Sequence, residues 1–569
     1  MLNFRWILRE RIDEEAVQHI INTLGIPAAI ARVLVGRGIA TTEAVQQFFE
    51  PSLDALNSPW LMADMQVAVD RVERAIADGE QIWIHGDYDV DGTSSTAMML
   101  HFLREVGARV QYFIPDRTVG FGFTRTSVDK AIAAGTKVII TVDIGITAID
   151  AIAYAKEFGI DVIVCDHHET AEELPPAHAI LDPIRPGCEY PFKSLAGCGV
   201  AFKLVQGVCD RLGRHELAHQ YMDFVAIASA ADIVPLVGEN RILSHVGLEQ
   251  LNSNPRPGLK GLIDCAGLTL GSINNSSIVF GLAPRINAAG RLGDPARAVE
   301  MMIQADELMS FRIAQELEQD NRRRRAIDEE TFEEAATHAE RLIQLSHPHS
   351  LVLHGDSWHA GVIGIVASRL VERFHLPTIM LTTIDGVAKG SARSIKDFDI
   401  HAALRTCEDL LIEYGGHKHA AGLSLEVDRV PELAARFDVI ARQQLTTEML
   451  TPEIDIDAEL SLNELTPNFF KLLARFAPYG YGNHRPVFFS RGVVSANGVK
   501  IVGNNHLKFR AIQKNFAIDA IGFNLGHKIS LCTNGKPFSV VYTLEENLFN
   551  GLTTPQLRIK DVRPDDAIE

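Results

Sequence analysis

The chain has 569 residues, of which 46% are hydrophobic and 22% are charged, and its formal net charge is −19. This length predicts about three to five domains, each large enough to bury a core, and the balance of residues is typical of a globular protein. The acidic charge excludes a protein that coats duplex DNA through one broad basic face, although a local basic groove can coexist with acidic outer surfaces.

The location in the cell is predicted from the cysteines and the apolar runs. The seven cysteines are scattered without a C-x-x-C pair, which favours reduced thiols in a cytoplasm. The first residues show no signal-peptide pattern, and the apolar runs are too short and too often interrupted to cross a membrane. We therefore expect a cytoplasmic protein that does not insert into membranes.

Strands and helices alternate in the first part of the chain, after a helical, proline-punctuated extension over residues 1–60. Wholly apolar strands alternating with helices predict a parallel sheet covered on both faces. In such sheets the functional groups collect at the carboxyl ends of the strands. The predicted strands are residues 81–85, 110–114, 138–142 and 162–165, and the predicted helices are residues 67–77, 93–107, 128–134, 148–158, 202–212 and 219–231.

Three further parts are predicted beyond this sheet. A long polar helix, broken near its start, runs from about residue 295 to 346, and it is long enough to bridge two domains. A second alternating unit follows, with strands at 350–353, 378–381 and 388–391 and then helical stretches, and short alternating segments from about 452 predict a small all-β barrel. The resulting α/β chain is divided into an extension (1–60), a parallel-sheet domain (61–250), a helical connector with the long helix (251–346), a smaller α/β domain (347–448) and a barrel (449–569).

Acidic residues mark the end of the first predicted strand. His85-Gly86-Asp87-Tyr88-Asp89-Val90-Asp91-Gly92-Thr93 places three aspartates within five residues, between a buried strand and a helix. Concentrating that much negative charge in a tight turn is costly unless a cation binds there. A solvated acidic turn is the alternative, because Asp and Gly both favour turns.

The other strand ends carry similar groups. Asp143 follows the strand at 138–142, Asp166-His167-His168 follows the strand at 162–165, and Asp232 follows the helix at 219–231. About five carboxylates with two or three imidazoles suit Mn²⁺ or Mg²⁺ rather than a thiolate-bound zinc. This number of ligands suits two ions that share a carboxylate, and such a pair, about 3.5–4 Å apart, supports in-line phosphoryl displacement.

These motifs resemble the DHH phosphoesterase superfamily. Asp166-His167-His168 resembles its signature, His85-x-x-x-Asp89-x-Asp91 its first motif, Asp143 its second and Asp232 its fourth. The later α/β unit resembles the DHHA1 domain through Gly-Gly-His-Lys-His-Ala-Ala-Gly at 415–422, and the barrel resembles an OB-fold. Within the superfamily, residues 61–569 are most similar to bacterial single-stranded-DNA-specific exonucleases. The stretches that carry this similarity are residues 85–92, 195–204, 283–295, 358–369 and 389–394.

The resemblance implies a role for each candidate ligand. One divalent cation would be held by His85, Asp89 and Asp143, and the other by Asp91, Asp143, His167 and Asp232. Asp143 would bridge the two ions, and His168 would face the scissile phosphate as a catalytic residue. Asp87 and Asp166 are expected to orient ligands rather than to bind metal.

Candidate substrate-binding residues complete the sequence-based prediction. A terminal phosphate needs arginines, and Arg117, Arg285, Arg291 and Arg393 are all predicted to lie in loops; structural ion pairs are the alternative. The resemblance places Ser391, Arg393 and His417 on a DHHA1 face opposite the metals, with the strand threading between the two domains. Tyr479 and Tyr481 are predicted to stack on bases of single-stranded DNA from the barrel, although barrel aromatics are more often core residues.

The resemblance implies a two-metal exonuclease that degrades single-stranded DNA from 5′ to 3′ and releases 5′-mononucleotides in recombination and repair. One alternative is a phosphoesterase that acts on short oligonucleotides or cyclic dinucleotides, and another is a single-strand-binding scaffold without catalysis. The expected partners are single-stranded DNA with a 5′ end, a single-strand-binding protein and a helicase. The chain is expected to act as a monomer.

Overall fold

The computed structural model describes residues 4–9, 12–115, 122–496, 498–549 and 552–565. Two compact units share the chain, and each is built from separate stretches of sequence. The larger unit comprises Asp13–Asn321 and Glu464–Arg485, and the smaller unit comprises Met1–Ile12, Arg322–Asn463 and Pro486–Glu569. Within the described ranges, no helix is both long enough and apolar enough to cross a membrane.

The larger unit contains the predicted parallel sheet. All its neighbouring strands run parallel, in the order β3-β2-β4-β5-β6, which confirms the expected architecture. The three-residue strand β6 was not predicted, because so short a segment has no recognisable pattern. The strands are β2 (Gln81–Gly86), β3 (Arg109–Phe113), β4 (Val138–Val142), β5 (Asp161–Cys165) and β6 (Ala179–Leu181).

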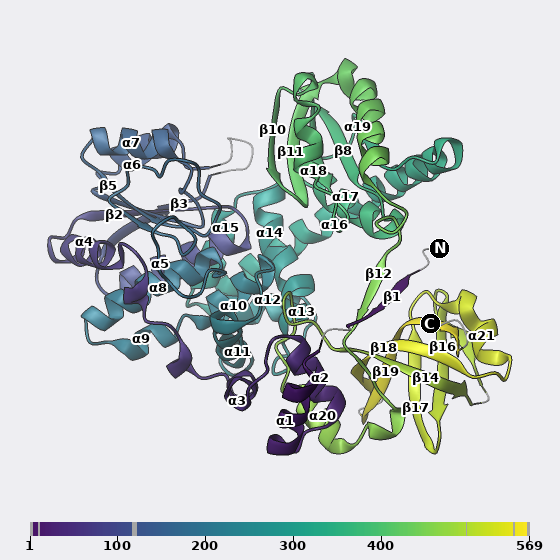
Figure 1. Cartoon of the computed structure of the whole chain (residues 1–569). Helices are drawn as coiled ribbons and strands as arrows, with labels where there is room; N and C mark the ends of the chain where they lie inside the picture. The colour runs from purple at the N-terminus through teal and green to yellow at the C-terminus, as the bar shows by residue number, and fades with distance from the viewer. Residues whose placement is uncertain (1–3, 10–11, 116–121, 497, 550–551, 566–569) are drawn as a thin grey trace. The chain divides into compact units, whose positions relative to one another are not determined.

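Both faces of this sheet are covered by helices. Ile82 and Ile140 pack against α4 (Met65–Ala77), α5 (Val90–Glu105) and α8 (Gly197–Arg211), whereas Trp83 and Ile139 pack against α6 (Arg125–Ala133) and α7 (Ile149–Glu157) (Figure 1). Alternate residues of a strand point to opposite faces, so one apolar strand supplies both cores.

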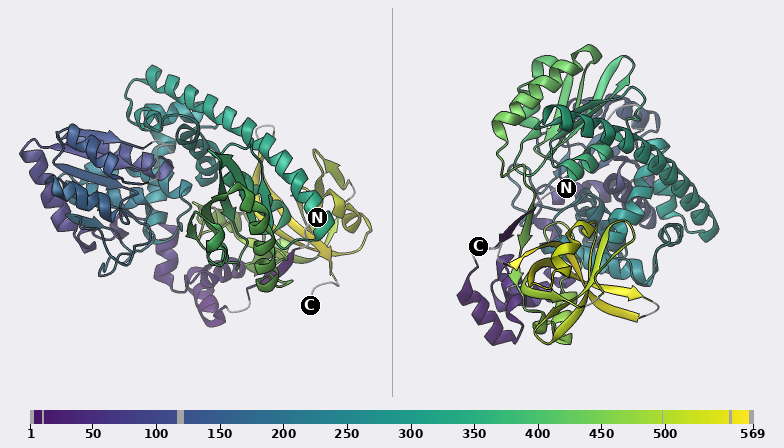
Figure 2. Two further views of the ribbon diagram at one scale, coloured as in Figure 1. Left: turned by 90° about the horizontal axis from the view of Figure 1, so that it is seen from above. Right: turned by 90° about the vertical axis from the view of Figure 1, so that its right-hand side faces the viewer.

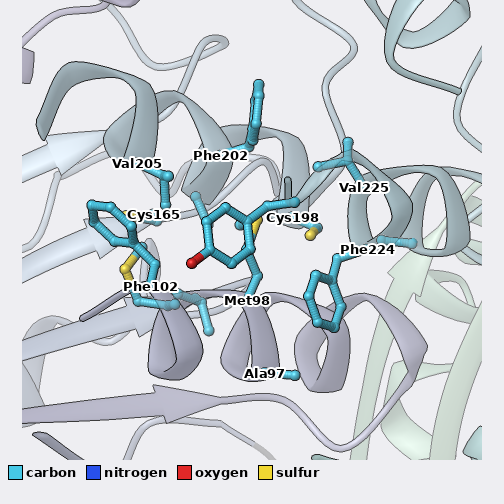
Figure 3. Close-up of a cluster of buried hydrophobic side chains, with 14 of the residues drawn as sticks. Ala97, Met98, Phe102, Cys165, Cys198, Phe202, Val205, Phe224 and Val225 are labelled. Atoms are coloured by element: carbon cyan, nitrogen blue, oxygen red, sulfur yellow. The ribbon is translucent and has the colours of Figure 1, made fainter. Parts of the chain in front are cut away.

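The core beneath α5 is dense and aromatic. Figure 3 shows Met98 and Phe102 of α5 beside Phe202 of α8 and Phe224 of α10 (Met222–Ala231). These side chains are buried, and burying each of them stabilises the fold by about 1.5–3 kcal/mol. The helix that carries Asp91 is therefore packed firmly against α8 and α10.

Helices form most of the remaining larger unit. The predicted long helix is confirmed, including its break: α15 (Ala296–Ile303) ends just before α16 (Glu307–Ser346), whose 40 residues span about 60 Å (Figure 2). Only the part of α16 up to Asn321 belongs to the larger unit, and the rest belongs to the smaller unit. The other helices are α1 (Glu14–Leu24), α2 (Ala28–Gly36), α3 (Thr42–Phe49), α9 (His215–His219), α11 (Gly238–Ser253), α12 (Pro257–Cys265), α13 (Asn275–Ser277), α14 (Ala283–Leu292) and α20 (Pro467–Ala474).

The N-terminal extension was predicted to be helical and punctuated by prolines, and the helical prediction is wrong for its first described residues. Strand β1 (Arg5–Leu8) pairs in parallel with β12 (Glu453–Ile456) in the smaller unit. Trp6 Nε1 also donates to Asp561 Oδ2 at 2.9 Å. This strand forms because a partner far along the chain pairs with it, and the four residues alone carry no such signal.

The smaller unit contains the second sheet, in the order β10-β11-β9-β8-β7. The hairpin of β10 and β11 was missed, since only helical stretches were expected after residue 391. Its glycine-rich sequence has low strand propensity, and pairing with β9 determines its conformation. The elements are β7 (Leu351–His354), α17 (Ile363–Phe374), β8 (Thr378–Ile384), β9 (Val387–Arg393), α18 (Ile400–Arg405), β10 (Glu413–His417), β11 (Ala420–Glu426) and α19 (Val430–Gln444).

The predicted all-β barrel is confirmed. Its strand order is β13-β14-β18-β19-β17-β16-β15, and the pairing of Val494 with Ile512 joins β14 back to β16. Segment Glu464–Arg485 lies inside the predicted barrel domain but belongs to the larger unit. The elements are β13 (Ala458–Glu459), β14 (Val487–Ser495), β15 (Lys500–Val502), β16 (His506–Gln513), β17 (Phe516–Gly522), α21 (Ile529–Thr533), β18 (Phe538–Phe549) and β19 (Leu552–Pro564).

Candidate metal centre

The acidic turn after β2 is shorter than predicted. Helix α5 begins at Val90 rather than at residue 93, and Asp89 caps it by accepting the N–H of Gly92 at 3.0 Å. Asp91 consequently lies in the first helical turn and is almost wholly buried. A β-carbon on Gly92 would lie 2.5 Å from the carbonyl oxygen of Asp87, so the tight turn requires glycine there.

Three other elements bring candidate ligands to the same edge. Asp143 directly follows β4, and its backbone has a left-handed φ of 61° while its N–H donates to Cys165 O at 2.9 Å. His167 follows β5, and Asp232 is the C-terminal cap of α10. An aspartate tolerates the left-handed region better than most residues do, so Asp143 can turn away from the end of its strand.

The candidate ligand atoms form three groups, and within each group all the atoms lie within 4.8 Å of one another. Some residues belong to more than one group. Asp143 joins His167 and His168 in one group and Asp87 and Asp89 in another, while the third consists of Asp91, His167 and Asp232. His167 Nε2 lies 3.1 Å from Asp143 Oδ1, 3.7 Å from Asp232 Oδ2 and 3.9 Å from Asp91 Oδ2. Asp143 therefore occupies the shared position that a bridging carboxylate needs.

His85 lies outside these three groups, but its environment is unusual. The ring is wholly buried, and its described hydrogen-bonding contact is with the backbone of Gly122. It packs edge-on against Phe123, with ring centroids 4.9 Å apart. Burial lowers the pKa of His85 to about 3, which keeps the ring neutral with a lone pair available for a cation.

The charges of the site fit a divalent cation. Burial and the neighbouring carboxylates raise the pKa values of Asp91 and Asp143, and burial with the charge of Asp89 raises the pKa of Asp232 to about 7. Burial and the adjacent His168 lower the pKa of His167 to about 4. Within the described part of the chain, Asp143 Oδ1 and His167 Nε2 are buried and form no hydrogen bond, although they lie 3.1 Å apart. Unpaired buried acceptors of this kind suit Mn²⁺ or Mg²⁺.

One backbone segment, residues 194–198, orients several candidate ligands. The N–H groups of Gly197 and Cys198 each donate to Asp91 at 2.7 Å, and His167 forms a hydrogen bond with the backbone of Leu195. A β-carbon on Gly197 would lie 2.5 Å from Asp143 Oδ1. Sequence reasoning assigned no role at the metal centre to this segment, although glycine at the start of a helix is a recognisable signal for close contact with an anion.

His168 is held by the aspartate two residues before it. Asp166 Oδ1 accepts from His168 Nδ1 at 2.7 Å, and its Oδ2 accepts the N–H of Ile146 at 2.9 Å. Burial opposes protonation of His168, but Asp166 and the nearby carboxylates raise the pKa of His168 to about 9. At neutral pH this half-exposed ring is therefore an imidazolium, which can donate to an anionic oxygen.

The predicted arginines are not in loops, contrary to expectation. Arg285 and Arg291 lie on α14, and Arg393 lies on β9; Arg117 lies outside the described residues. Arg285 is buried, and its Nε pairs with Glu318 Oε2 at 2.7 Å. This ion pair is the structural role that was the alternative for each arginine. Proline at the start of α14 is compatible with a helix, and it was mistaken for a loop signal.

Ser391, Arg393 and His417 lie on one face of the second sheet. Ser391 of β9 pairs with Gly422 of β11, which in turn pairs with Gly415 of β10. In the same way, Arg393 of β9 pairs with Ala420 of β11, which pairs with His417 of β10. Paired residues on adjacent strands point to the same face. The two glycines have open space above them, and Arg393 Nη1 donates to Ser391 Oγ at 2.8 Å. The open surface over Gly415 and Gly422, the glycine floor, therefore lies on the same face as the guanidinium of Arg393, the hydroxyl of Ser391 and the imidazole of His417.

The predicted tyrosines lie in the segment Glu464–Arg485, which packs in the larger unit rather than among the barrel strands. Tyr479 donates its hydroxyl to Leu473 O at 2.7 Å, and the guanidinium of Arg485 lies 4.4 Å from its ring centroid. The carbonyl of Tyr481 accepts the N–H of Leu236 at 2.8 Å, while the residue is 54% exposed. Of the two rings, that of Tyr481 is the more accessible to a ligand.

Family comparisons agree with this architecture. Residues 81–229 match the DHH family N-terminal domain, residues 347–443 match the DHHA1 domain, and residues 456–561 match the RecJ OB domain. A parallel sheet with aspartates and histidines at its carboxyl edge, followed by these two domains, defines a multidomain protein of the DHH class.

Full-length relatives specify the family more closely. The chain is 38% identical over 561 residues to the single-stranded-DNA-specific exonuclease RecJ of Bacillus subtilis (strain 168), covering 98% of this chain and 70% of that protein. It is 33% identical over 564 residues to RecJ of Escherichia coli (strain K12), covering 95% and 96%. The chain belongs to the RecJ family of single-stranded-DNA-specific exonucleases.

Solved structures agree with this assignment. RecJ from Thermus thermophilus in complex with Mn²⁺ matches with a TM-score of 0.85 at 29% identity, covering 100% of this chain and 80% of that one. The complex of that protein with Mg²⁺ matches with a TM-score of 0.78 at 27% identity, covering 98% and 78%.

Proposed function

We infer that this chain is a metal-dependent exonuclease specific for single-stranded DNA, and that its candidate metal centre hydrolyses the phosphodiester bond. Membership of the RecJ family supports the activity. One observation of the site carries the chemistry: Asp143, at the end of a buried strand, belongs to two groups of converging ligand atoms. We propose that the centre holds two ions, Mn²⁺ or Mg²⁺, with Asp143 between them.

We assign His85, Asp89 and Asp143 to one ion, and Asp91, Asp143, His167 and Asp232 to the other. When bound, two such cations activate water and stabilise the attacking and leaving oxygens. The chain's own contribution is to fix the carboxylate of Asp91 through the N–H groups of residues 197 and 198. The imidazolium of His168, held by Asp166, supplies a proton or a hydrogen bond to the reacting phosphate.

The direction of cleavage follows from where a terminal phosphate binds. We propose that the face with Ser391, Arg393 and His417 binds a 5′ phosphate, so that cleavage proceeds from 5′ to 3′ and releases 5′-mononucleotides. The glycine floor supports this proposal, because Gly415 and Gly422 leave room for a sugar-phosphate backbone to approach the strands. Arg393 supplies the multi-donor cation that a dianion requires.

Replacing Arg393 with alanine tests this pocket. We expect the preference for a 5′-phosphorylated over a 5′-hydroxyl single strand to fall by about 10- to 100-fold, because a hydrogen bond to a charged group is worth about 1.5–3 kcal/mol. Arg405→Ala is the control, because it removes a positive charge from α18, which packs with Ala388 and Ala392 on the opposite face of this sheet, and it should leave the preference intact. An unchanged preference in Arg393→Ala would place the phosphate pocket elsewhere.

The proposed activity is tested with 5′- and 3′-labelled single strands incubated with Mn²⁺, Mg²⁺ or a chelator. We expect labelled mononucleotide from the 5′-labelled strand and a shrinking ladder from the 3′-labelled strand, with no cleavage of blunt duplex or in chelator. Cleavage confined to short oligonucleotides or cyclic dinucleotides would favour the small-substrate alternative. Tight strand binding without nucleotide release would favour the scaffold.

The oligomeric state, the location in the cell and the protein partners are further predictions. We propose that the enzyme acts as a monomer in the cytoplasm, beside a single-strand-binding protein and a helicase. A nuclease that rejects duplex DNA needs ends that another protein has unwound.

A further inference from the structure

Three consecutive polar residues at the start of α11 have buried side chains: Glu239, Asn240 and Arg241. Glu239 pairs with Lys203 at 2.8 Å, and Arg241 donates to backbone carbonyls such as that of Phe476. Both residues stabilise the packing of the larger unit. Asn240 differs, because its contacts lead towards the candidate metal centre although it is not a ligand.

The side-chain amide of Asn240 joins two segments of backbone. Its Nδ2 donates to the carbonyl oxygen of Ser194 and, at 3.1 Å, to that of Pro235. Ser194 begins the segment 194–198, which forms hydrogen bonds to Asp91 and His167. Pro235 lies three residues after Asp232. The wholly buried side-chain amide of Asn240 therefore connects the backbone segments that support Asp91, His167 and Asp232, which together form one group of candidate ligands.

The backbone after Asp232 needs such support. Ile233 has a left-handed φ of 59°, which is strained for a β-branched residue, and its side chain is 60% exposed. A strained conformation of this kind persists only where the surrounding structure holds it. Two hydrogen bonds do so here: that from Asn240 to Pro235 and that from the N–H of Leu236 to the carbonyl of Tyr481.

We propose that Asn240 is a positioning residue of the metal centre. Acting through the carbonyls of Ser194 and Pro235, it fixes the separation between Asp232 on one side and Asp91 and His167 on the other. The inference rests on the proposed function, since it concerns the residues that would hold one of the ions. Hydrogen-bonded supports of metal ligands commonly contribute about 10- to 100-fold to metal affinity.

The chain offers a matched control on the same helix. Asn252 of α11 also uses its Nδ2 to donate to two carbonyl oxygens, those of Leu248 and Ile273, each at 2.8 Å. Neither of these carbonyls belongs to a segment that bears a candidate ligand. Asn240→Leu removes two hydrogen bonds, and Asn252→Leu removes three, since Asn252 Oδ1 also accepts the N–H of Ile273 at 2.7 Å. Only the first variant removes a connection to the site, so the control loses at least as many hydrogen bonds as the test.

The test is a calorimetric titration of the metal-free full chain with Mn²⁺, alongside thermal unfolding of each variant. We expect Asn240→Leu to weaken Mn²⁺ binding by about 10- to 100-fold, while Asn252→Leu lowers stability and leaves Mn²⁺ affinity unchanged. Asn240→Ser retains one donor and should show an intermediate loss, so it provides the test if the leucine variant does not fold.

Wild-type Mn²⁺ affinity in the Asn240 variants would overturn the proposal, and so would an equal loss of affinity in Asn240→Leu and Asn252→Leu. The readout is binding rather than turnover. A failure of the positioning role is therefore distinguishable from a failure of the proposed function, which would appear as a wild-type chain that releases no nucleotides.

Discussion

Asp143→Asn is expected to lower the rate of metal-dependent cleavage of single-stranded DNA by about 1,000-fold or more. Asp143 is the carboxylate common to two of the ligand groups, and an amide at that position has one oxygen and no charge. Metal-assisted charge stabilisation is worth several kcal/mol, and each 1.36 kcal/mol corresponds to a tenfold change in rate. Single-turnover cleavage of a 5′-labelled strand measures the effect, and Mn²⁺ titration shows whether an ion is lost.

Asp150→Asn is the control for this prediction. Asp150 is an exposed residue in the first turn of α7, the helix that follows the same strand, and it belongs to none of the ligand groups. Its variant should cleave at the wild-type rate. If Asp143→Asn retained more than a tenth of the wild-type rate, the central position of Asp143 would be wrong.

The second large effect is on stability, because the metal-free site holds carboxylates that resist ionisation. The pKa of Asp232 is raised by burial and by Asp89 to about 7, and burial with the neighbouring carboxylates also raises the pKa values of Asp91 and Asp143. A carboxyl group whose folded-state pKa is raised holds a proton that the unfolded chain has already released. The metal-free larger unit should therefore lose stability as pH rises from about 4 to about 7.

Binding of a divalent cation should reverse this loss. We expect Mn²⁺ to raise the unfolding temperature by several degrees at pH 8 and much less at pH 5, where protons compete for the same oxygens. At a Mn²⁺ concentration of 100 times Kd, binding stabilises the folded state by about 2.7 kcal/mol. Thermal unfolding with Mn²⁺ or with chelator at the two pH values measures both effects, and Asp143→Ala serves as a variant with a damaged site. Equal or larger Mn²⁺ stabilisation at pH 5 would contradict the assignment.

Local sequence patterns predicted the parts of the fold that determine the site. Apolar strands alternating with helices indicate a parallel sheet, and such a sheet brings the residues after β2, β4 and β5 to one edge. The start of α5 was misplaced, although Asp89 three residues before Gly92 is a recognisable cap. A search for caps would have placed Asp91 inside the helix from the sequence alone.

Other features depend on pairing across long sequence separations, so no local pattern reveals them. Gly197 meets Asp91 across 106 positions, and Asn240 meets Ser194 across 46. The hairpin of β10 and β11 and the strand β1 likewise form because their partners are present. Arg285 was assigned to substrate because its stretch was predicted to be a loop, and local sequence does not disclose its partner Glu318, which lies on a different helix.

The interleaving of the two units along the chain has a consequence for biosynthesis. The guanidinium of Arg241 is buried, and three of its carbonyl acceptors belong to residues 475–477. A nascent chain that has emerged only as far as residue 321 therefore leaves this cation with a single described acceptor residue, Phe48. Domains usually fold in order as the ribosome releases them, but here the larger unit cannot be completed until the segment Glu464–Arg485 has been made, after residues 322–463 of the smaller unit.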